Sequence, residues 1–313
     1  MKVSIIIPVY NVEKYIERCL HSVFAQSYHN LECILVNDST PDKSFLIAKE
    51  LIEDYHGCIE FHLIEHEKNS GLSEARNTGV RSSHGEYLFF LDSDDTLPQN
   101  AISLLVKTAQ SNDNPEIVMG VTKGINAKGE IIDVSTNQNL SFYNNKDVFE
   151  GYLNNKWYLI GCNKLISADI FKKHKTFFQP GIYHEDVLWS FEISTYINKL
   201  ILCPYVTYYY YLGDSNSISR SPLSIKRMED SLLILERKAK YLGQTTDDNL
   251  LAQHIKQVGI SYVYAMARNH FPKAIIKGFL KRIDKLIHID CIANSKGKIP
   301  LHWALAYQYY RYF

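Results

Sequence analysis

The sequence predicts an α/β fold, in which a mostly parallel β-sheet flanked by helices is followed by a helical region. Two observations support this class. Short apolar, β-branched runs alternate with amphipathic segments in the first part of the chain. After Pro222 the apolar positions recur at helical spacing almost to the end. We therefore expect a sheet domain over residues 1–215 and a helical region over residues 222–313.

Four apolar runs predict the strands of the first part. They are Val3–Val9, Leu31–Val36, the alternating segment Ile59–Leu63, and Tyr87–Leu91. The segment between the first two runs places apolar residues at helical spacing from Val12 to Phe24, and Asn11 precedes it as a candidate N-cap. Further helices are expected to begin near Pro41 and after Pro98.

The alternation weakens from about Glu116, and we expect short strands and loops that complete the same domain. A helix is then expected from Glu185, followed by a strand from Leu200 to about Tyr211. The polar residues 213–221 are typical of a linker. Beyond them, breaks near Gly243 and at Pro272 divide the helical region into three helices and a short aromatic tail.

Composition narrows the class of protein. The 313 residues include 34 Lys+Arg and 34 Asp+Glu, for a formal net charge of zero, and 46% are hydrophobic, which excludes disordered and collagen-like chains. Because the net charge is zero, no nucleic-acid partner is expected. The six cysteines are scattered singly without a CxxC pair, which indicates a reducing, cytosolic compartment.

Neither a targeting signal nor a membrane span is expected. Pro8 interrupts the short apolar run at the N-terminus, and no uninterrupted apolar stretch approaches the roughly 18 residues of a membrane helix. We therefore expect a cytoplasmic protein, with peripheral attachment to the inner face of the membrane left open.

Peripheral attachment is left open because one C-terminal segment is both basic and amphipathic. Its basic residues interleave with Ile, Leu and Phe and are Lys273, Lys277, Lys281, Arg282 and Lys285. An ordinary amphipathic helix packed against the rest of the protein is the simpler interpretation. The aromatic C-terminal end also leaves a homodimer contact open.

Acidic and polar residues follow the predicted strands. Because right-handed crossovers bring the carboxyl ends of parallel strands to one edge, ligands are expected there. Asn37–Thr40 follows the second strand, and Asp92–Asp95 follows the fourth. Clustered carboxylates suit hard divalent cations such as Mg²⁺ and Mn²⁺. The alternative is a solvated turn in which Asp95 or Thr96 caps the next helix.

The chain lacks the glycine-rich motifs that usually bind phosphates. No GxGxxG follows the first strand, and no GxxxxGK[ST] occurs. If the site binds a nucleotide, its phosphates would need another source of positive charge. A metal ion held by carboxylates is the available source.

Four motifs in order resemble the family-2 glycosyltransferases, which have the GT-A fold. They are Ser4–Asn11 (SIIIPVYN), Val36–Thr40 (VNDST), Asn69–Gly79 (NSGLSEARNTG) and Phe90–Asp95 (FLDSDD). The resemblance covers roughly the first hundred residues closely, and it extends more weakly through Asn163–Leu165 and His184–Asp186. Asn37 departs from the pattern, because the family more often has a second aspartate there.

The resemblance implies a site for a UDP-sugar. The main chain around Pro8, Val9 and Tyr10 would hold the uracil together with Asp38, and Arg76 would point toward the nucleotide. For Asp38 the alternative is an Asx-turn with Ser39 and Thr40. For Arg76 the alternative is a surface arginine.

The same resemblance assigns the metal and the chemistry. Asp92 and Asp94 would form the DxD pair that contacts the ribose and a Mn²⁺ or Mg²⁺ ion, with Asp95 as a third candidate ligand. Asp186 beside Glu185 would be the general base. Capping of a helix N-terminus is the alternative for these two acids.

Two residues near this last motif are candidates for contact with the acceptor, namely Trp189 and His184. Core packing is the commoner role of such an aromatic residue. Arg220, in the segment before the helical region, is a further candidate for contact with the phosphates.

The resemblance thus implies a metal-dependent, inverting transfer of a sugar from a UDP-sugar to a carbohydrate or lipid-linked saccharide, in surface polysaccharide biosynthesis. Two alternatives remain open. One is a non-catalytic module that binds a nucleotide-sugar. The other is a sugar nucleotidyltransferase, which normally has a glycine-rich, basic loop after the first strand, where this chain has Val9–Val12.

Overall fold

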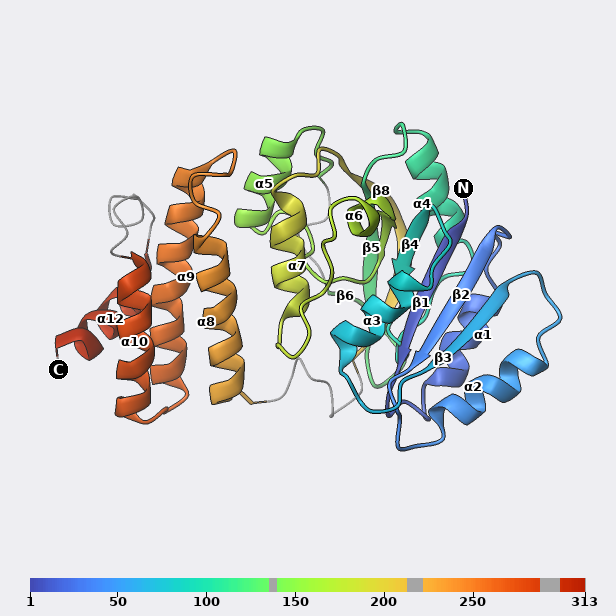
Figure 1. Cartoon of the computed structure of the whole chain (residues 1–313), viewed down its shortest axis with the longest axis horizontal. Helices are drawn as coiled ribbons and strands as arrows, with labels where there is room; N and C mark the ends of the chain where they lie inside the picture. Colours follow the sequence, from blue (N-terminus) through green and yellow to red (C-terminus); the bar gives the residue numbers. More distant parts are fainter. Residues whose placement is uncertain (135–139, 213–221, 288–298, 313) are drawn as a thin grey trace. The chain divides into compact units, whose positions relative to one another are not determined.

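The computed structural model describes residues 1–134, 140–212, 222–287 and 299–312. The chain divides into two compact units (Figure 1). The first comprises Met1–Gly181 and Glu185–Ser217, and the second comprises Ile182–His184 and Ile218–Phe313. The expected linker 213–221, with Arg220, lies outside the described residues.

The first unit contains a mixed eight-stranded sheet. Its parallel part has the order β3-β2-β1-β4 and consists of β1 (Val3–Val9), β2 (Leu31–Asn37), β3 (Glu60–Glu65) and β4 (Tyr87–Phe90). These strands confirm the four predicted from apolar runs. β1 and β2 are buried along their whole length, because helices cover both faces of a doubly wound sheet.

The second half of the sheet is mixed in direction. It consists of β5 (Ile117–Ile125), β6 (Ile131–Asp133), β7 (Lys164–Ser167) and β8 (Leu200–Tyr211). β7 runs antiparallel to both β4 and β5, whereas β8 runs parallel to β5. Since two antiparallel steps restore the direction, β5 and β8 end at the same edge of the sheet as β1, β2 and β4.

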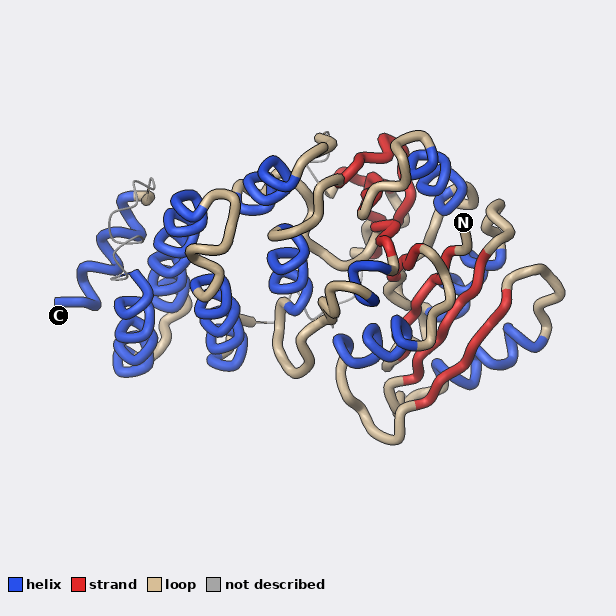
Figure 2. Tube along the Cα trace, turned by 45° about the horizontal axis from the view of Figure 1, so that its top comes forward, coloured by secondary structure: helices blue, strands red, loops and turns tan. Residues whose placement is uncertain are grey.

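Helices α1 (Ile16–Phe24), α2 (Ser44–Glu53), α3 (Leu72–Arg81) and α4 (Ala101–Gln110) connect the strands. Because the chain steps outward from β1 to β3 and then returns to β4, right-handed crossovers place α1 and α2 on one face and α3 on the other (Figure 2). The expected Asn11 cap is wrong. α1 begins at Ile16 after Tyr15, and Asn11 lies in the preceding turn with a φ of 55°.

The region after Glu116 holds more helix than its weak periodicity predicted. Asn144 is the N-cap of α5 (Asn145–Leu153), and its side chain accepts a hydrogen bond from the Asp147 N–H at 2.9 Å. α6 (Asp169–Lys172) is a single turn, and α7 (Glu185–Ser194) begins where its acidic first turn predicted.

The second unit is helical. It contains α8 (Ile225–Ala239), α9 (Asp248–Arg268), α10 (Lys273–Ile287) and α12 (Leu301–Tyr312). The first three confirm the helices expected between Pro222, Gly243 and Pro272. The expected aromatic tail is instead a helix, α12, which packs on α9 and α10. In the described part of the chain, no helix is long and apolar enough to cross a membrane.

Candidate active site

Arg76 on α3 links two acidic motifs that are far apart in the sequence. Its side chain is buried, and its two terminal nitrogens donate to different carboxylates. Nη2 donates to Asp92 Oδ1 at 2.8 Å, and Nη1 donates to Glu185 Oε1 at 3.0 Å. The planar guanidinium fixes the geometry of both acids. The interpretation of Arg76 as a surface arginine is therefore wrong.

The acids at the start of α7 hold their protons more tightly than ordinary carboxyl groups. Burial raises the pKa of Glu185 and of Asp186, and the charge of Arg76 opposes both shifts. Burial also disfavours the charge on Arg76, but Asp92, Cys162 and Glu185 raise the pKa of Arg76 above its usual value. The result is a partly buried cluster of acids around one buried cation.

Position at a helix N-terminus also favours these two carboxylates. Both lie in the first turn of α7, where the macrodipole stabilises negative charge. Asp186 Oδ1 accepts a hydrogen bond from the Val187 N–H at 2.8 Å. The capping interpretation therefore describes where the acids are, and it is compatible with a chemical role.

Asp38 is almost fully buried behind β2. Its Oδ1 accepts from the Ser70 N–H at 2.8 Å and lies 2.7 Å from His66 Nδ1, and its Oδ2 accepts from the Gly71 N–H at 2.7 Å. Asp38 thus holds the turn before α3, where Gly71 adopts a φ of 88°. A uracil N–H would be an additional donor to oxygens that already have protein partners.

The side chain that stabilises the turn after β2 is that of Asn37, not that of Asp38. Asn37 Oδ1 accepts from the Thr40 N–H at 2.9 Å, across Ser39 with its φ of 55°. The departure from the family pattern at Asn37 therefore has a local structural use, because the amide forms the turn while Asp38 holds α3.

At the end of β1, two buried residues are followed by one exposed aromatic ring. Pro8 and Val9 are buried, and the Val9 carbonyl accepts from the Asp38 N–H at 3.1 Å. Tyr10, the next residue, keeps 46% of its surface exposed. Its ring is accessible at the edge where the nucleotide base was expected.

Helix α1 holds the Asp92–Asp95 loop through backbone carbonyls. Arg18 Nη2 donates to the Asp94 carbonyl at 2.5 Å, and Cys19 Sγ lies 3.8 Å from the Asp92 carbonyl. The Arg18 guanidinium lies 3.5 Å from the centre of the Tyr211 ring. The loop is thereby fixed to α1 and to the end of β8.

Asp95 has different partners from Asp92. It is 1% exposed, and its oxygens accept from the Tyr208 hydroxyl at 2.7 Å and from the Tyr211 N–H at 2.9 Å. Burial and the charges of Asp94 and Asp92 raise the pKa of its carboxyl well above the usual value. This geometry favours a structural role for Asp95 and leaves Asp92 and Asp94 as the candidate metal ligands.

The partners of Asp95 give a test of this division of roles. Asp95→Ala would leave the buried Tyr208 hydroxyl and the Tyr211 N–H without an acceptor, so we expect it to lower the free energy of unfolding by about 2–4 kcal/mol. Asp94→Ala, at a partly exposed position, should cost less than about 1 kcal/mol. Urea denaturation of both variants measures the difference. Equal losses would contradict the structural role of Asp95.

The donor set at this loop suits a hard cation. Asp92 is about one-third exposed and Asp94 is partly exposed, and carboxylate oxygens are the ligands that Mg²⁺ and Mn²⁺ prefer. Mg²⁺ usually takes one or two carboxylates and completes its coordination with water and substrate phosphates. Two available carboxylates, rather than three, therefore fit a metal that arrives with a diphosphate.

Within the described residues, one group of three potential metal-ligating side chains is found elsewhere, at the amino edge of the sheet. Glu32, His62 and His84 place their ligand atoms within 4.8 Å of one another. The Lys2 ammonium already pairs with Glu32 at 2.6 Å. The ion pair between Lys2 and the buried Glu32 accounts for this cluster.

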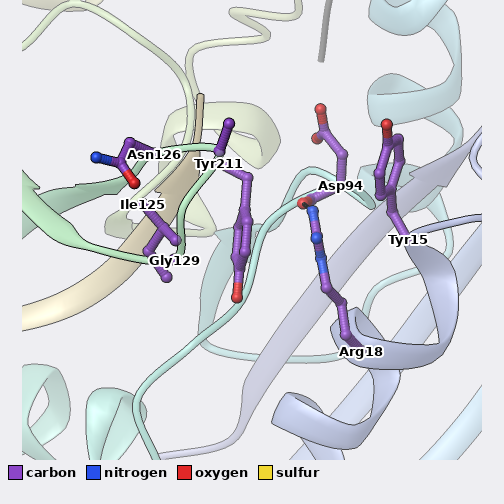
Figure 3. A pocket seen from close by; sticks show the side chains of 8 residues that line it. Tyr15, Arg18, Asp94, Ile125, Asn126, Gly129 and Tyr211 are labelled. Atoms are coloured by element: carbon purple, nitrogen blue, oxygen red, sulfur yellow. Dashed lines mark hydrogen bonds between the residues drawn. The ribbon is translucent and has the colours of Figure 1, made fainter. Parts of the chain in front are cut away.

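A pocket of about 340 Å³ lies beside Asp94 (Figure 3). Tyrosine rings, a guanidinium, a carboxylate and small or apolar residues line it, namely Tyr15, Arg18, Asp94, Ile125, Asn126, Ala127, Gly129 and Tyr211. Its size is within the range of small-molecule sites. Rings beside charged hydrogen-bonding groups suit a saccharide, whose ring has apolar C–H groups and whose edge has hydroxyls.

Sequence reasoning missed two buried groups near Arg76. Cys162 Sγ lies 3.6 Å from Arg76 Nη2, and Lys164, at the start of β7, donates its ammonium to the Ile160 carbonyl. Burial lowers the pKa of Lys164 to about 7, although Cys162 and Asp186 favour its charge. The available signal was the lysine of Asn163–Leu165, which is flanked by apolar residues on both sides in the segment 159–166.

The two acceptor candidates have different outcomes. Trp189 is 1% exposed, stacks on both Phe171 and Phe178 in one aromatic cluster, and donates its ring N–H to the Thr176 carbonyl at 3.1 Å. Stacking of Trp189 on an acceptor sugar is therefore wrong, and core packing is its role. His184 precedes α7 with a φ of 63°, and its contact with an acceptor stays a prediction.

Comparison with known proteins agrees with this geometry. Residues 4–175 match the model of glycosyl transferase family 2. Glycosyltransferase GlyA of Streptococcus pneumoniae is 45% identical over 106 residues, which cover 34% of this chain and 15% of GlyA. The poly(ribitol-phosphate) beta-glucosyltransferase of Bacillus spizizenii is 30% identical over 231 residues, covering 71% of this chain and 34% of that protein. This chain thus covers about a third or less of the length of these two relatives.

The fold has a close counterpart among solved structures. The crystal structure of S. aureus TarS 1-349 in complex with UDP-GlcNAc superposes with a TM-score of 0.71 at 17% identity, covering 99% of this chain and 92% of that one. This likeness confirms the GT-A fold that the four motifs implied. Because the family model matches more than half of the chain, we conclude that the protein belongs to glycosyl transferase family 2.

Proposed function

We propose that this protein is a metal-dependent, inverting glycosyltransferase that moves a sugar from a UDP-sugar to a saccharide acceptor. The observation that carries the proposal is the buried Arg76, which holds Asp92 of the DxD loop and Glu185 beside the candidate base in one cluster. The two motifs with complementary roles in such a reaction are thus joined by a single side chain.

The donor would lie along the carboxyl edge of the sheet. Tyr10 would meet the base, and Asp92 and Asp94 would hold the metal. When bound, the metal neutralises the diphosphate as it leaves. Protein atoms enclose the Arg76 Nε, so Arg76 would act on the donor by holding Asp92 in place.

Asp186 would remove the proton from the attacking hydroxyl. Its carboxylate is partly buried beside the cluster, and desolvation raises its pKa, as is common for a general base. Attack from the face opposite to the diphosphate inverts the anomeric carbon in one step and needs no covalent intermediate. Glu185 would act through Arg76 by keeping its guanidinium in place.

The acceptor class is suggested by the relatives. One relative is a poly(ribitol-phosphate) beta-glucosyltransferase, and TarS was crystallised with UDP-GlcNAc. We therefore propose a hexose or N-acetylhexosamine donor and a cell-surface polymer, or its lipid-linked precursor, as acceptor. The pocket beside Asp94 has room for part of the saccharide.

Calorimetric titration with UDP, with and without Mn²⁺, tests the donor site. We expect binding that strengthens at least tenfold with Mn²⁺, and Asp94→Ala should remove this metal dependence because one of two candidate ligands is lost. GDP and NAD⁺ are the control ligands. Folded protein that does not bind UDP under either condition would contradict the UDP assignment.

Hydrolysis or transfer assays separate the enzyme from the alternative binding module. A module would bind UDP-sugars in the same metal-dependent way but release no UDP in the presence of any acceptor. A sugar nucleotidyltransferase would instead release diphosphate from UTP and a sugar phosphate.

A further inference from the structure

Helix α10 presents a row of lysines on its outer side. Lys273, Lys277, Lys281 and Lys285 are four residues apart and are all exposed. Side chains at this spacing lie one above another along a helix. We call these four residues the basic face. Ala274 and Gly278 are also exposed, and a Cβ at Gly278 would meet nothing within 4 Å, so no neighbouring group covers the helix at that position.

The opposite side of α10 is already packed. Ile276, Phe279, Leu280 and Ile283 are at most 5% exposed within the helical unit. This confirms the expectation of an ordinary packed amphipathic helix as far as the apolar side is concerned. Arg282 is balanced inside the unit, because it pairs with Glu236 at 2.9 Å and with Glu229 at 2.5 Å.

Helix α12 adds exposed apolar side chains next to the basic face. Leu301, Leu305 and Tyr309 are 74%, 61% and 52% exposed, and they too are four residues apart. We call them the apolar stripe. The Lys273 ammonium lies 5.4 Å from the Tyr309 ring centre, so the stripe adjoins the basic face. Tyr307, by contrast, is 4% exposed and seats the helix on the unit.

We propose that the basic face and the apolar stripe together form a docking surface for an anionic lipid bilayer. Lysines near an anionic leaflet are attracted to its headgroups, and leucines and tyrosines beside them can enter the interface. A protein partner fits less well, because lysines are depleted from protein interfaces. A nucleic acid could pair with the lysines, but it would leave the leucines of the apolar stripe exposed to water.

Sedimentation of the full chain with vesicles tests the proposal. We expect binding to phosphatidylcholine vesicles that contain about one-third phosphatidylglycerol, weakening as salt rises, and little binding to phosphatidylcholine alone. Replacing the four lysines of the basic face with glutamine should weaken binding more than about 100-fold, because each lysine contributes roughly fivefold. The matched control replaces Lys107, Lys128, Lys156 and Lys172, four exposed lysines of the other unit.

The stripe is tested separately. Leu301→Ser with Leu305→Ser should weaken binding about tenfold without unfolding the protein, because both side chains are largely exposed. Trp303 on α12 is only partly buried, whereas Trp157 and Trp189 are fully buried, so a blue shift of tryptophan emission on vesicle binding would report α12.

Three results would overturn the proposal. They are equal binding to neutral and anionic vesicles, an equal loss in the control variant, and no binding by folded wild-type protein. None of these readouts depends on sugar transfer. The membrane proposal can therefore be refuted while the proposed function stands, and the proposed function can be refuted while the membrane proposal stands.

Discussion

Asp186→Asn is expected to abolish sugar transfer while leaving UDP binding in place. Asparagine keeps the size and the hydrogen-bonding oxygen that accepts from the Val187 N–H, but it cannot take a proton from an attacking hydroxyl. Loss of a positioned general base lowers kcat by about 10²- to 10⁴-fold. UDP release in a coupled assay measures kcat, and calorimetry with Mn²⁺ measures nucleotide binding.

The pH profile gives a second readout of the same residue. A base acts in its ionised form, so transfer should rise with pH through the pKa of Asp186. Because burial raises that pKa, the rise should lie at higher pH than for an ordinary aspartate of pKa about 3.9, and the residual activity of Asp186→Asn should lack it.

A matched control lies on the same helix. Glu192 is an acid of α7 about two turns after Asp186 and is not part of the Arg76 cluster. Glu192→Gln should leave kcat within about twofold of wild type. If Asp186→Asn weakened UDP binding as much as it lowered kcat, Asp186 would belong to the donor site and the assignment of the base would be wrong.

The parallel half of the sheet could be predicted because each of its strands is marked by apolar residues that lie close together in the sequence. Val3–Val9 and Leu31–Asn37 are buried on both faces, so their sequences are nearly continuous apolar runs. The stretch from Glu116 to Lys172 resisted prediction because β6 is short and exposed and α5 has a weak amphipathic pattern. Beyond it, α7 and β8 confirm the helix expected from Glu185 and the strand expected from Leu200 to about Tyr211. The helix α12 was missed because its most exposed residues are apolar.

The candidate site was predictable in its members but not in its connections. Motif resemblance named Asp92, Arg76 and Glu185, yet nothing in their spacing shows that one guanidinium joins the two acids. The burial of Trp189 and Asp95 was equally hidden, because each depends on contacts with segments far along the chain. Long-range pairing is decided by the tertiary fold, which a local pattern does not encode.

Arg76→Met is expected to be the most destabilising single change at the site. Methionine fills similar space but removes the charge, so the carboxylates of Asp92 and Glu185 lose their shared partner. Removing one partner of a buried ion pair typically costs about 3–5 kcal/mol, and the lower end applies here because Asp92 is one-third exposed. Urea denaturation should show the loss, and metal-dependent UDP binding should fall with it.

Two companion variants make this interpretation specific. Arg81 lies on the same helix but pairs with Glu74 at the surface, so Arg81→Met should cost less than about 1 kcal/mol. Adding Glu185→Gln to Arg76→Met should restore part of the lost stability, because the neutral amide no longer needs a cation. If Arg76→Met were as stable as wild type, or if Glu185→Gln destabilised it further, the two acids would not depend on Arg76. The link between the DxD loop and the base would then have to be sought elsewhere, in Cys162 or Lys164.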